Sequence, residues 1–237
     1  MKKRFRIILI ISLMINIIFI GIAGIVIVKK GGLSYFLAKL SSKESSNFSS
    51  YYLGKKDLHD NLNETSDKIV FIGDSLTDRA EWSELLENDN IINRGIDSDT
   101  TFGVLNRIDG IIDITPQKVF LMIGINDIAE GISEDEIINN YDKILSEFKE
   151  NSSETKVYIQ ELLPVVEKRV TNKKNSDILN LNLKIKDLAK SYDYTFIDMY
   201  NTFEDNNELN DKFTVDGLHL SYEGYQNWKN NIYKYID

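Results

Sequence analysis

The stretch IVFIGDSLT, residues 69–77, decides the fold. Four apolar residues, Ile69 to Ile72, form a short run that ends at Gly73, and polar residues follow at once. An apolar run of this length bounded by glycine is typical of a buried strand in a parallel sheet. Ser75 would then lie in the turn between that strand and a helix, where its hydroxyl can project from the edge of the sheet.

Strand-like and helical patterns alternate outward from this stretch. We predict further strands at 91–93, 119–123, 156–160 and 194–197, and helices at 80–87, 101–112, from Ser133 onward, 178–188 and 221–235. Such alternation indicates βαβ units, whose right-handed crossovers cover both faces of a parallel sheet. The expected architecture is therefore a three-layer α/β/α sandwich around five parallel strands.

Polar segments follow two more of these strands, and another precedes the last helix. They are Asn93-Arg94-Gly95, Gly124-Ile125-Asn126-Asp127 and Asp216-Gly217-Leu218-His219. Ligands bind at the carboxyl ends of the strands in sheets of this type. Since Ser75, Gly95 and Asn126 all fall just past strand ends, we expect them at one rim.

A serine hydrolase needs an imidazole that takes the serine proton and returns it to the leaving alcohol. Of the two histidines, His59 precedes the first strand, where we expect it to be solvated, and His219 is thus the candidate base for Ser75. Asp216, three residues earlier, can orient the imidazole, although Asp-Gly is also a common turn. A serine that follows a strand is, taken alone, more often a helix cap than a nucleophile. The prediction for Ser75 therefore depends on the stretch 69–77 and the three polar segments together.

The four segments resemble the SGNH hydrolases, also called the GDSL esterase/lipase family. The four named residues read Ser75, Gly95, Asn126 and His219 here. The short sequences around Gly95 and Asn126 are most similar to those of the branch that contains platelet-activating-factor acetylhydrolase-like and carbohydrate acetylesterases. The resemblance covers roughly residue 68 to the end of the chain and implies the flavodoxin-like SGNH fold.

The resemblance also implies roles for these residues. Ser75, Asp216 and His219 would be catalytic, and the N–H groups of Ser75 and Gly95 with the side chain of Asn126 would form the oxyanion hole. Glycine and asparagine are also ordinary turn residues, so neither would be informative alone. Asp74 and Asp127 neighbour these positions, and we interpret both as supports of loop geometry. The sequence suggests no metal site and no cofactor, since it has no His/Cys cluster and no Gly-rich phosphate loop.

Charge is unevenly distributed along the 237 residues. Residues 1–40 hold seven Lys/Arg and no acid, so the rest of the chain has a formal net charge of −16. An acidic body argues against nucleic acid as a partner. The chain has no cysteine, which excludes a disulfide framework and a cysteine nucleophile.

Residues 7–28 carry no charge, and a helix of this length would span about 33 Å, enough for a bilayer core. A cleaved signal peptide, with secretion, is the alternative, but its apolar region is usually shorter and ends at small residues. Lys2, Lys3, Arg4 and Arg6 favour a cytoplasmic N-terminus. We therefore expect a single-pass membrane anchor over 1–30, a stalk over 31–67 and an extracellular catalytic domain over 68–237.

These observations predict a membrane-anchored extracellular serine esterase that acts through an acyl-serine intermediate. Its expected substrates are short-chain esters, especially acetyl esters on cell-surface carbohydrate. A lysophospholipase or short-chain lipase, and a non-catalytic binding protein on the same fold, are the alternatives.

Overall fold

The computed structural model describes residues 48–62 and 65–236, and a five-stranded parallel sheet lies at its centre. The strand order is β2-β1-β3-β4-β5, and every pairing is parallel. The strands are β1 (Ile69–Gly73), β2 (Ile91–Gly95), β3 (Lys118–Met122), β4 (Lys156–Gln160) and β5 (Thr195–Ile197). β1 and β3 are buried along their whole length, as expected for strands covered on both faces. The predicted α/β fold with five parallel strands is confirmed.

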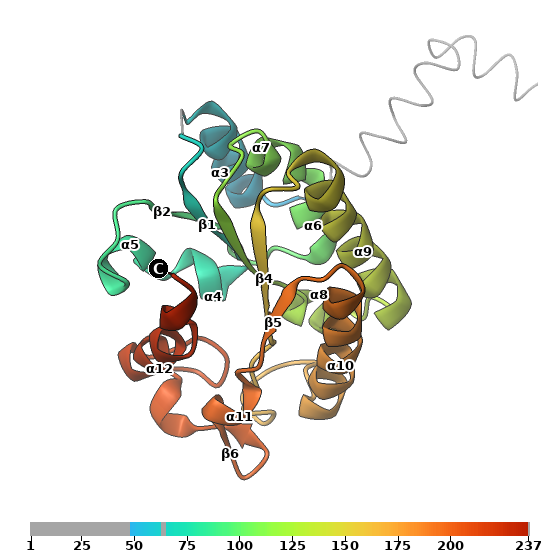
Figure 1. Cartoon of the computed structure of the whole chain (residues 1–237). Coiled ribbons are helices and arrows are strands. Elements are labelled where there is room, and N and C mark those ends of the chain that lie inside the picture. The colour runs from blue at the N-terminus through green and yellow to red at the C-terminus, as the bar shows by residue number, and fades with distance from the viewer. Residues whose placement is uncertain (1–47, 63–64, 237) are drawn as a thin grey trace, which may run out of the picture. The chain divides into compact units, whose positions relative to one another are not determined.

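Helices cover both faces of this sheet (Figure 1). On one face, α9 contacts its neighbours α6, α7 and α10; on the other, α4 and α5 contact β2, and α12 packs beside them. The first group is α6 (Thr101–Asn106), α7 (Ile108–Ile112), α9 (Glu134–Asn151) and α10 (Asn175–Ser191). The second is α4 (Ser75–Asp78), α5 (Trp82–Leu85) and α12 (Tyr222–Ile232), which a 3-10 turn, η2 (Tyr233–Tyr235), extends.

The longest helix, α9, follows its sequence pattern. The side chain of Ser133 accepts a hydrogen bond from the N–H of Glu136, which caps the helix. Residues spaced three and four apart form its buried stripe: Ile137, Tyr141, Ile144, Leu145 and Phe148. This stripe packs α9 onto the sheet.

An aromatic cluster fills the opposite face. The ring of Phe71 stacks on Trp82 at 4.2 Å and on Phe120 at 4.8 Å between centroids. Trp82 meets Trp228 edge-to-face at 4.9 Å, and Trp228 donates a hydrogen bond to Gln160 Oε1. Contacts of this kind join β1, β3 and β4 to α5 and α12.

Two predicted helices are interrupted in the structure. Within the expected helix at 80–87 only Trp82–Leu85 is helical, as α5, and the separate short helix α4 precedes it. The expected helix at 101–112 breaks at Arg107, whose φ of −120° is not helical, because its side chain turns inward to bind Asp99 and strand-end carbonyls. The sequence pattern shows the apolar face of 101–112 but not this polar contact.

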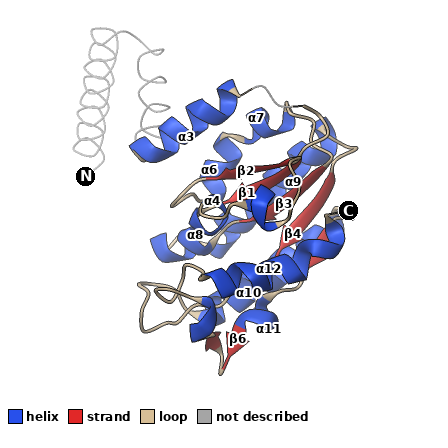
Figure 2. Cartoon of the chain, turned by 90° about the vertical axis from the view of Figure 1, so that its left-hand side faces the viewer, coloured by secondary structure: helices blue, strands red, loops and turns tan. Residues whose placement is uncertain are grey.

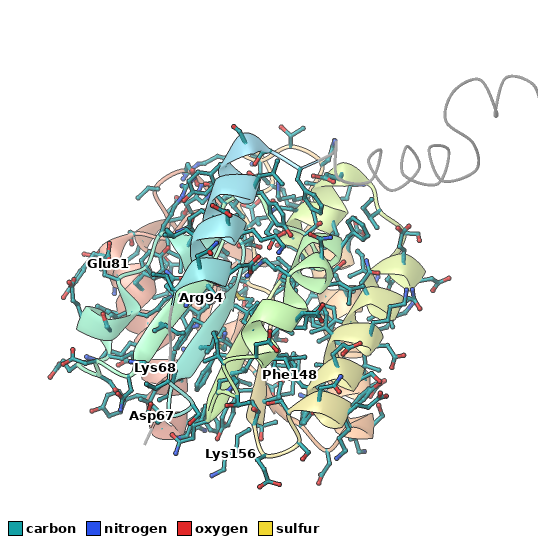
Figure 3. The ribbon with its side chains drawn as sticks, turned by 90° about the horizontal axis from the view of Figure 1, so that it is seen from above. Asp67, Lys68, Glu81, Arg94, Phe148 and Lys156 are labelled. Atoms are coloured by element: carbon teal, nitrogen blue, oxygen red, sulfur yellow. The ribbon has the colours of Figure 1, made fainter. Side chains whose placement is uncertain are left out.

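The two ends of the sheet differ in character. Lys68 and Lys156 lie at the amino end of the strands (Figure 3). The carboxyl ends lead into the predicted site segments and α8 (Ile125–Glu130) (Figure 2). Between β5 and α12 the chain forms α11 (Tyr200–Phe203), the hairpin β6 (Glu204–Asp205) and β7 (Glu208–Leu209), and a 3-10 turn, η1 (Asp211–Phe213), none of which the sequence analysis predicted.

The segment expected to be a stalk differs from that expectation within its described residues. Residues 50–61 form the helix α3 (Ser50–Asn61), and the compact unit begins at Ser50 instead of Lys68. Tyr52 of α3 is buried and donates a hydrogen bond to the carbonyl of Gly103 at 2.7 Å. His59 is half-buried instead of solvated, and burial followed by the nearby Arg94 and Arg107 lowers its pKa to about 3.

The predicted membrane anchor, residues 1–30 with the uncharged run 7–28, lies outside the described residues. Within 48–62 and 65–236, no helix has both the length and the apolar character needed to cross a membrane.

Candidate active site

Ser75 begins α4 directly after β1. Asp74 caps this helix by accepting the N–H of Leu76 at 3.0 Å, which turns the chain sharply at the strand end. Gly73 is needed here because an added Cβ would lie 2.5 Å from the carbonyl oxygen of Met122. Among the bonds found in the described chain, none involves the N–H of Ser75, so it is available to a ligand at the helix start.

His219 comes from a tight loop between η1 and α12. The Oγ1 of Thr214 accepts the N–H of Gly217 and donates to the carbonyl of His219, both at 2.8 Å. Gly217 has a φ of +99°, which a residue with a side chain rarely adopts. This closed loop places His219 Nε2 3.1 Å from Ser75 Oγ, across 144 residues of sequence.

Asp216 orients the imidazole from within the same loop. Its Oδ1 accepts the backbone N–H groups of Leu218 and His219, and its Oδ2 lies 2.6 Å from His219 Nδ1. Burial alone would raise the pKa of Asp216, but the hydrogen bonds from His219 and Leu218 lower it to about 2. An ionised Asp216 keeps the proton on Nδ1 and leaves Nε2 free to accept the serine proton.

Asn126 lies in the first turn of α8, after β3. Gly124 caps this helix with a φ of +130°, which lets the chain turn at the strand end. The amide of Asn126 donates one hydrogen bond to the carbonyl of Asp99 at 2.9 Å. A primary amide has two N–H bonds, so the second remains for a ligand. The hydrogen bond to Asp99 connects Asn126 to the loop that follows β2.

Gly95 differs from its predicted role. Its N–H donates to the side-chain oxygen of Asn93 at 2.8 Å and is therefore engaged. An added Cβ at Gly95 would lie 2.3 Å from the backbone nitrogen of Asp78. In this structure Gly95 lets β2 pack closely against α4, instead of offering its N–H to an oxyanion.

Ser98 lies in the loop that follows β2, and it was not among the predicted site residues. The N–H groups of Ile96, Asp97 and Asp99 are all hydrogen bonded, whereas none of the bonds found in the described chain involves the N–H of Ser98. Its φ of +62° is left-handed, which serine rarely adopts. The run Asp97-Ser98-Asp99, whose residue types favour turns, was the sequence feature that could have indicated this loop.

Asp74 and Asp127, predicted as supports, are both buried. Asp127 accepts the N–H and the hydroxyl of Thr101, which ties α8 to the start of α6. Asp74 caps α4 through Oδ1, and its Oδ2 has no hydrogen-bond partner in the described structure. Burial raises the pKa of Asp74 to about 7 and raises that of Asp127 as well.

Arg107 and Asp99 form a charged pair that was not among the predicted site residues. Both are buried, and the guanidinium contacts Asp99 Oδ2 through Nε at 3.0 Å and through Nη2 at 2.8 Å. Arg107 also donates to the carbonyls of Arg94 and Gly73. It therefore joins the ends of β1 and β2 to the loop that contacts Asn126, a role with no short sequence motif.

The arrangement suits acyl transfer to a serine. The geometry brings together a hydroxyl, an imidazole and a carboxylate, with the unengaged N–H of Ser75 and the amide of Asn126 at the same edge. In the described residues no group of three or more His, Cys, Asp or Glu could hold a metal ion.

Comparisons with known proteins agree with this chemistry. The GDSL-like lipase/acylhydrolase family matches residues 71–226. N-acylneuraminate cytidylyltransferases of Streptococcus agalactiae are 25% identical over 176 residues, which are 74% of this chain and 40% of theirs. This chain thus spans less than half the length of those relatives.

Solved structures share the fold over most of the chain. A Streptococcus pneumoniae protein named as a platelet activating factor matches with a TM-score of 0.73 at 27% identity, covering 86% of this chain and 99% of its own. An acetylxylan esterase of Geobacillus stearothermophilus has a TM-score of 0.59 at 18% identity, covering 72% and 94%, a likeness of fold. Because the family match includes Ser75, Asn126 and His219 and most of the chain, the protein belongs to the GDSL-like lipase/acylhydrolase family, the SGNH hydrolases, and is a carboxylic ester hydrolase.

Proposed function

We propose that this chain is a membrane-anchored extracellular esterase that removes short acyl groups, above all acetyl, from carbohydrate. The observation that carries the esterase part of this proposal is the contact of Ser75 Oγ with His219 Nε2 at 3.1 Å, with Asp216 Oδ2 at 2.6 Å from His219 Nδ1.

In the proposed reaction, Ser75 attacks the ester carbonyl while His219 Nε2 takes the hydroxyl proton. The ionised Asp216 stabilises the imidazolium that forms. The N–H of Ser75 and the amide of Asn126 hold the negative oxygen of the tetrahedral intermediate. When the intermediate collapses, His219 gives its proton to the leaving alcohol, and an acyl-serine remains. Water, deprotonated by His219, then attacks the acyl-serine, releases the carboxylic acid and restores Ser75.

Short acyl groups and a carbohydrate substrate are favoured by the likeness to the acetylhydrolase branch around Gly95 and Asn126. An acetylxylan esterase shares the fold, and the Streptococcus agalactiae relatives are named for a sugar substrate, N-acylneuraminate. The extracellular location is favoured by the uncharged run at 7–28 and the basic residues before it.

The direct test is turnover of p-nitrophenyl acetate by the full chain in a non-ionic detergent. Ser75→Ala should lower kcat by about 10⁴-fold or more, because the nucleophile is lost. Ser153→Ala, which changes an exposed serine in the turn before β4, is the matched control and should keep the wild-type rate. Equal rates for wild type and Ser75→Ala would favour the non-catalytic alternative.

Acyl length separates the esterase from the lipase alternative. We expect kcat/KM to be higher for p-nitrophenyl acetate than for the octanoate ester. A clear preference for octanoate would instead indicate a short-chain lipase or lysophospholipase, for which a membrane anchor is equally suitable.

A further inference from the structure

A basic loop lies beside the active site of this acidic protein. The basic loop, residues 166–174, contains Lys168, Arg169, Lys173 and Lys174 against the single acid Glu167, whereas residues 41–237 as a whole carry a net charge of −16. Positive charge concentrated in one loop of an acidic chain indicates a local role, since a general need for solubility would not place it there.

Asn175 holds the loop closed at its base. Its side-chain amide exchanges two hydrogen bonds with the backbone of Val165, both at 2.9 Å, and its own N–H donates to Glu167 Oε1 at 2.8 Å. Asn175 is buried at the start of α10. The loop is therefore fixed where it leaves and rejoins the domain.

The basic loop contacts both sides of the catalytic edge. The N–H of Val166 donates to the carbonyl of Gly217 at 2.8 Å, next to Asp216 in the catalytic loop. The side chain of Arg169 also packs there, because an added Cβ at Gly217 would lie 2.7 Å from Arg169 Cβ. At its other end, Asn172 donates to the carbonyl of Ala129 in α8, the helix that holds Asn126.

Lys173 is the cation of this loop that faces inward. It is half-buried, and no ion pair or hydrogen bond involves its ammonium among the described residues, whereas Arg169 is paired with Asp211 at 2.8 Å. The charge that acts most on Lys173 is that of Asp74, the residue before the nucleophile. Burial lowers the pKa of Lys173, since no partner in the described chain replaces the water it has lost.

We propose that the basic loop recognises an anionic group on the substrate, and that Lys173 is the residue that binds it. The inference rests on the proposed esterase function and narrows its substrate class to esters of acidic carbohydrates, in which the anion is a carboxylate or a phosphate. A substrate anion would supply the charge partner that the half-buried ammonium lacks.

The test compares three sugars acetylated at the same hydroxyl: glucose, glucuronate and glucose 6-phosphate. Acetate release by the full chain in non-ionic detergent is measured for wild type and Lys173→Gln. We expect wild type to show a lower KM for at least one acidic sugar than for the neutral one. Lys173→Gln should raise that KM about tenfold, the value of a charge-assisted hydrogen bond, with little change in kcat or in the reaction with acetylglucose.

Lys190→Gln, which changes an exposed lysine near the end of α10, is the matched control and should leave all three reactions unchanged. The glucuronate and phosphate arms identify which anion is bound. Equal KM values for neutral and acidic sugars, or an equal loss on all three in Lys173→Gln, would overturn this inference while the esterase stands. Absence of any Ser75-dependent ester hydrolysis would overturn the proposed function and this inference together.

Discussion

Asp216 shows how a single residue organises the site. Its two oxygens act separately, because Oδ1 binds the backbone of its own loop while Oδ2 meets His219 Nδ1. Since both contacts come from one rigid carboxylate, the loop conformation and the direction of the imidazole are set together. The buried Asp74 beside Ser75 behaves differently, because one of its oxygens has no comparable partner in the described structure.

Asp74 leads to a prediction about pH. Burial raises its pKa in the folded protein to about 7, against an ordinary value of 3.8. The folded state therefore holds a proton that the unfolded state has released, and stability falls as pH rises from about 4 to 7. Asp74→Asn keeps the cap acceptor without the charge, so its stability should exceed that of wild type by about 4 kcal/mol at pH 8 and match it at pH 4.

Urea unfolding at the two pH values measures this difference. Asp89→Asn, which changes an exposed acid between α5 and β2, is the control and should show no such gain. A variant at Asp74 that is less stable than wild type at pH 8 would mean that the carboxylate is stabilised in the fold, contrary to this expectation.

Gly95, at the end of β2, and Ser98, in the loop that follows, allow opposite predictions. Gly95→Ala should destabilise the protein by about 1–3 kcal/mol, because the new Cβ would press on the backbone of Asp78. Ser98→Gly should keep esterase activity, with stability unchanged or higher by up to about 1 kcal/mol, because glycine adopts the left-handed φ more easily. Thermal unfolding and p-nitrophenyl acetate turnover check both. A stable, active Gly95→Ala would contradict the packing role.

At the scale of elements, α3 connects to the catalytic helix α4. Tyr51 donates to Asp78 Oδ2 at 2.6 Å, and the ammonium of Lys55 lies 2.8 Å from Asp78 Oδ1. Asp78 Oδ2 also accepts the N–H of Asp97 at 3.1 Å. One carboxylate at the end of α4 thus joins α3 to the loop that carries Ser98.

This packing predicts that α3 belongs to the stable catalytic unit. Tyr52→Ala should lower the free energy of unfolding by about 3 kcal/mol, because a buried aromatic ring and its hydrogen bond to Gly103 are lost. Tyr51→Ala, which truncates an exposed neighbouring tyrosine, should cost about 1 kcal/mol or less.

A shortened chain tests the same point. A protein that starts at Lys68 should melt at a lower temperature than one that starts at Phe48, measured by circular dichroism. Equal melting temperatures, together with a small effect of Tyr52→Ala, would return α3 to the role of a stalk.

At the scale of the whole molecule, the doubly wound order β2-β1-β3-β4-β5 determines where the site lies. In this order the chain passes from β1 to β2 on one side and then crosses to β3 on the other side of β1, so a crevice opens at the carboxyl ends of β1 and β3. Ser75, the loop with Ser98, and Asn126 follow β1, β2 and β3. The opposite end, where Lys68 and Lys156 lie (Figure 3), carries none of the predicted site residues.

The proposed anchor gives the prediction at this scale. After expression of the full chain, esterase activity should remain in the membrane fraction through alkaline carbonate washing, and external protease should remove it from intact cells. Deleting residues 1–30 should move the activity to the soluble fraction. Activity in the medium with a cleaved N-terminus would favour the signal-peptide alternative, and activity protected from external protease would place the domain inside the cell.

The sequence determined the parallel sheet, because buried strands in α/β proteins are continuous apolar runs that stand out between amphipathic helices. It also predicted Ser75, Asp216, Asn126 and His219 as site residues, since each lies in a short motif beside a recognisable element. Shorter elements such as α11 and the β6–β7 hairpin were not predicted, because they have too few residues to show a periodic pattern.

Only the tertiary structure decided which backbone N–H groups are free, which acids are buried and what α3 contacts. Gly95 looked available from its neighbours in sequence, yet the N–H is engaged by Asn93, whose own amide binds three carbonyls of the segment 77–80. Hydrogen bonds and burial depend on groups that are distant along the chain, so they are settled when the elements pack, and no local pattern contains them.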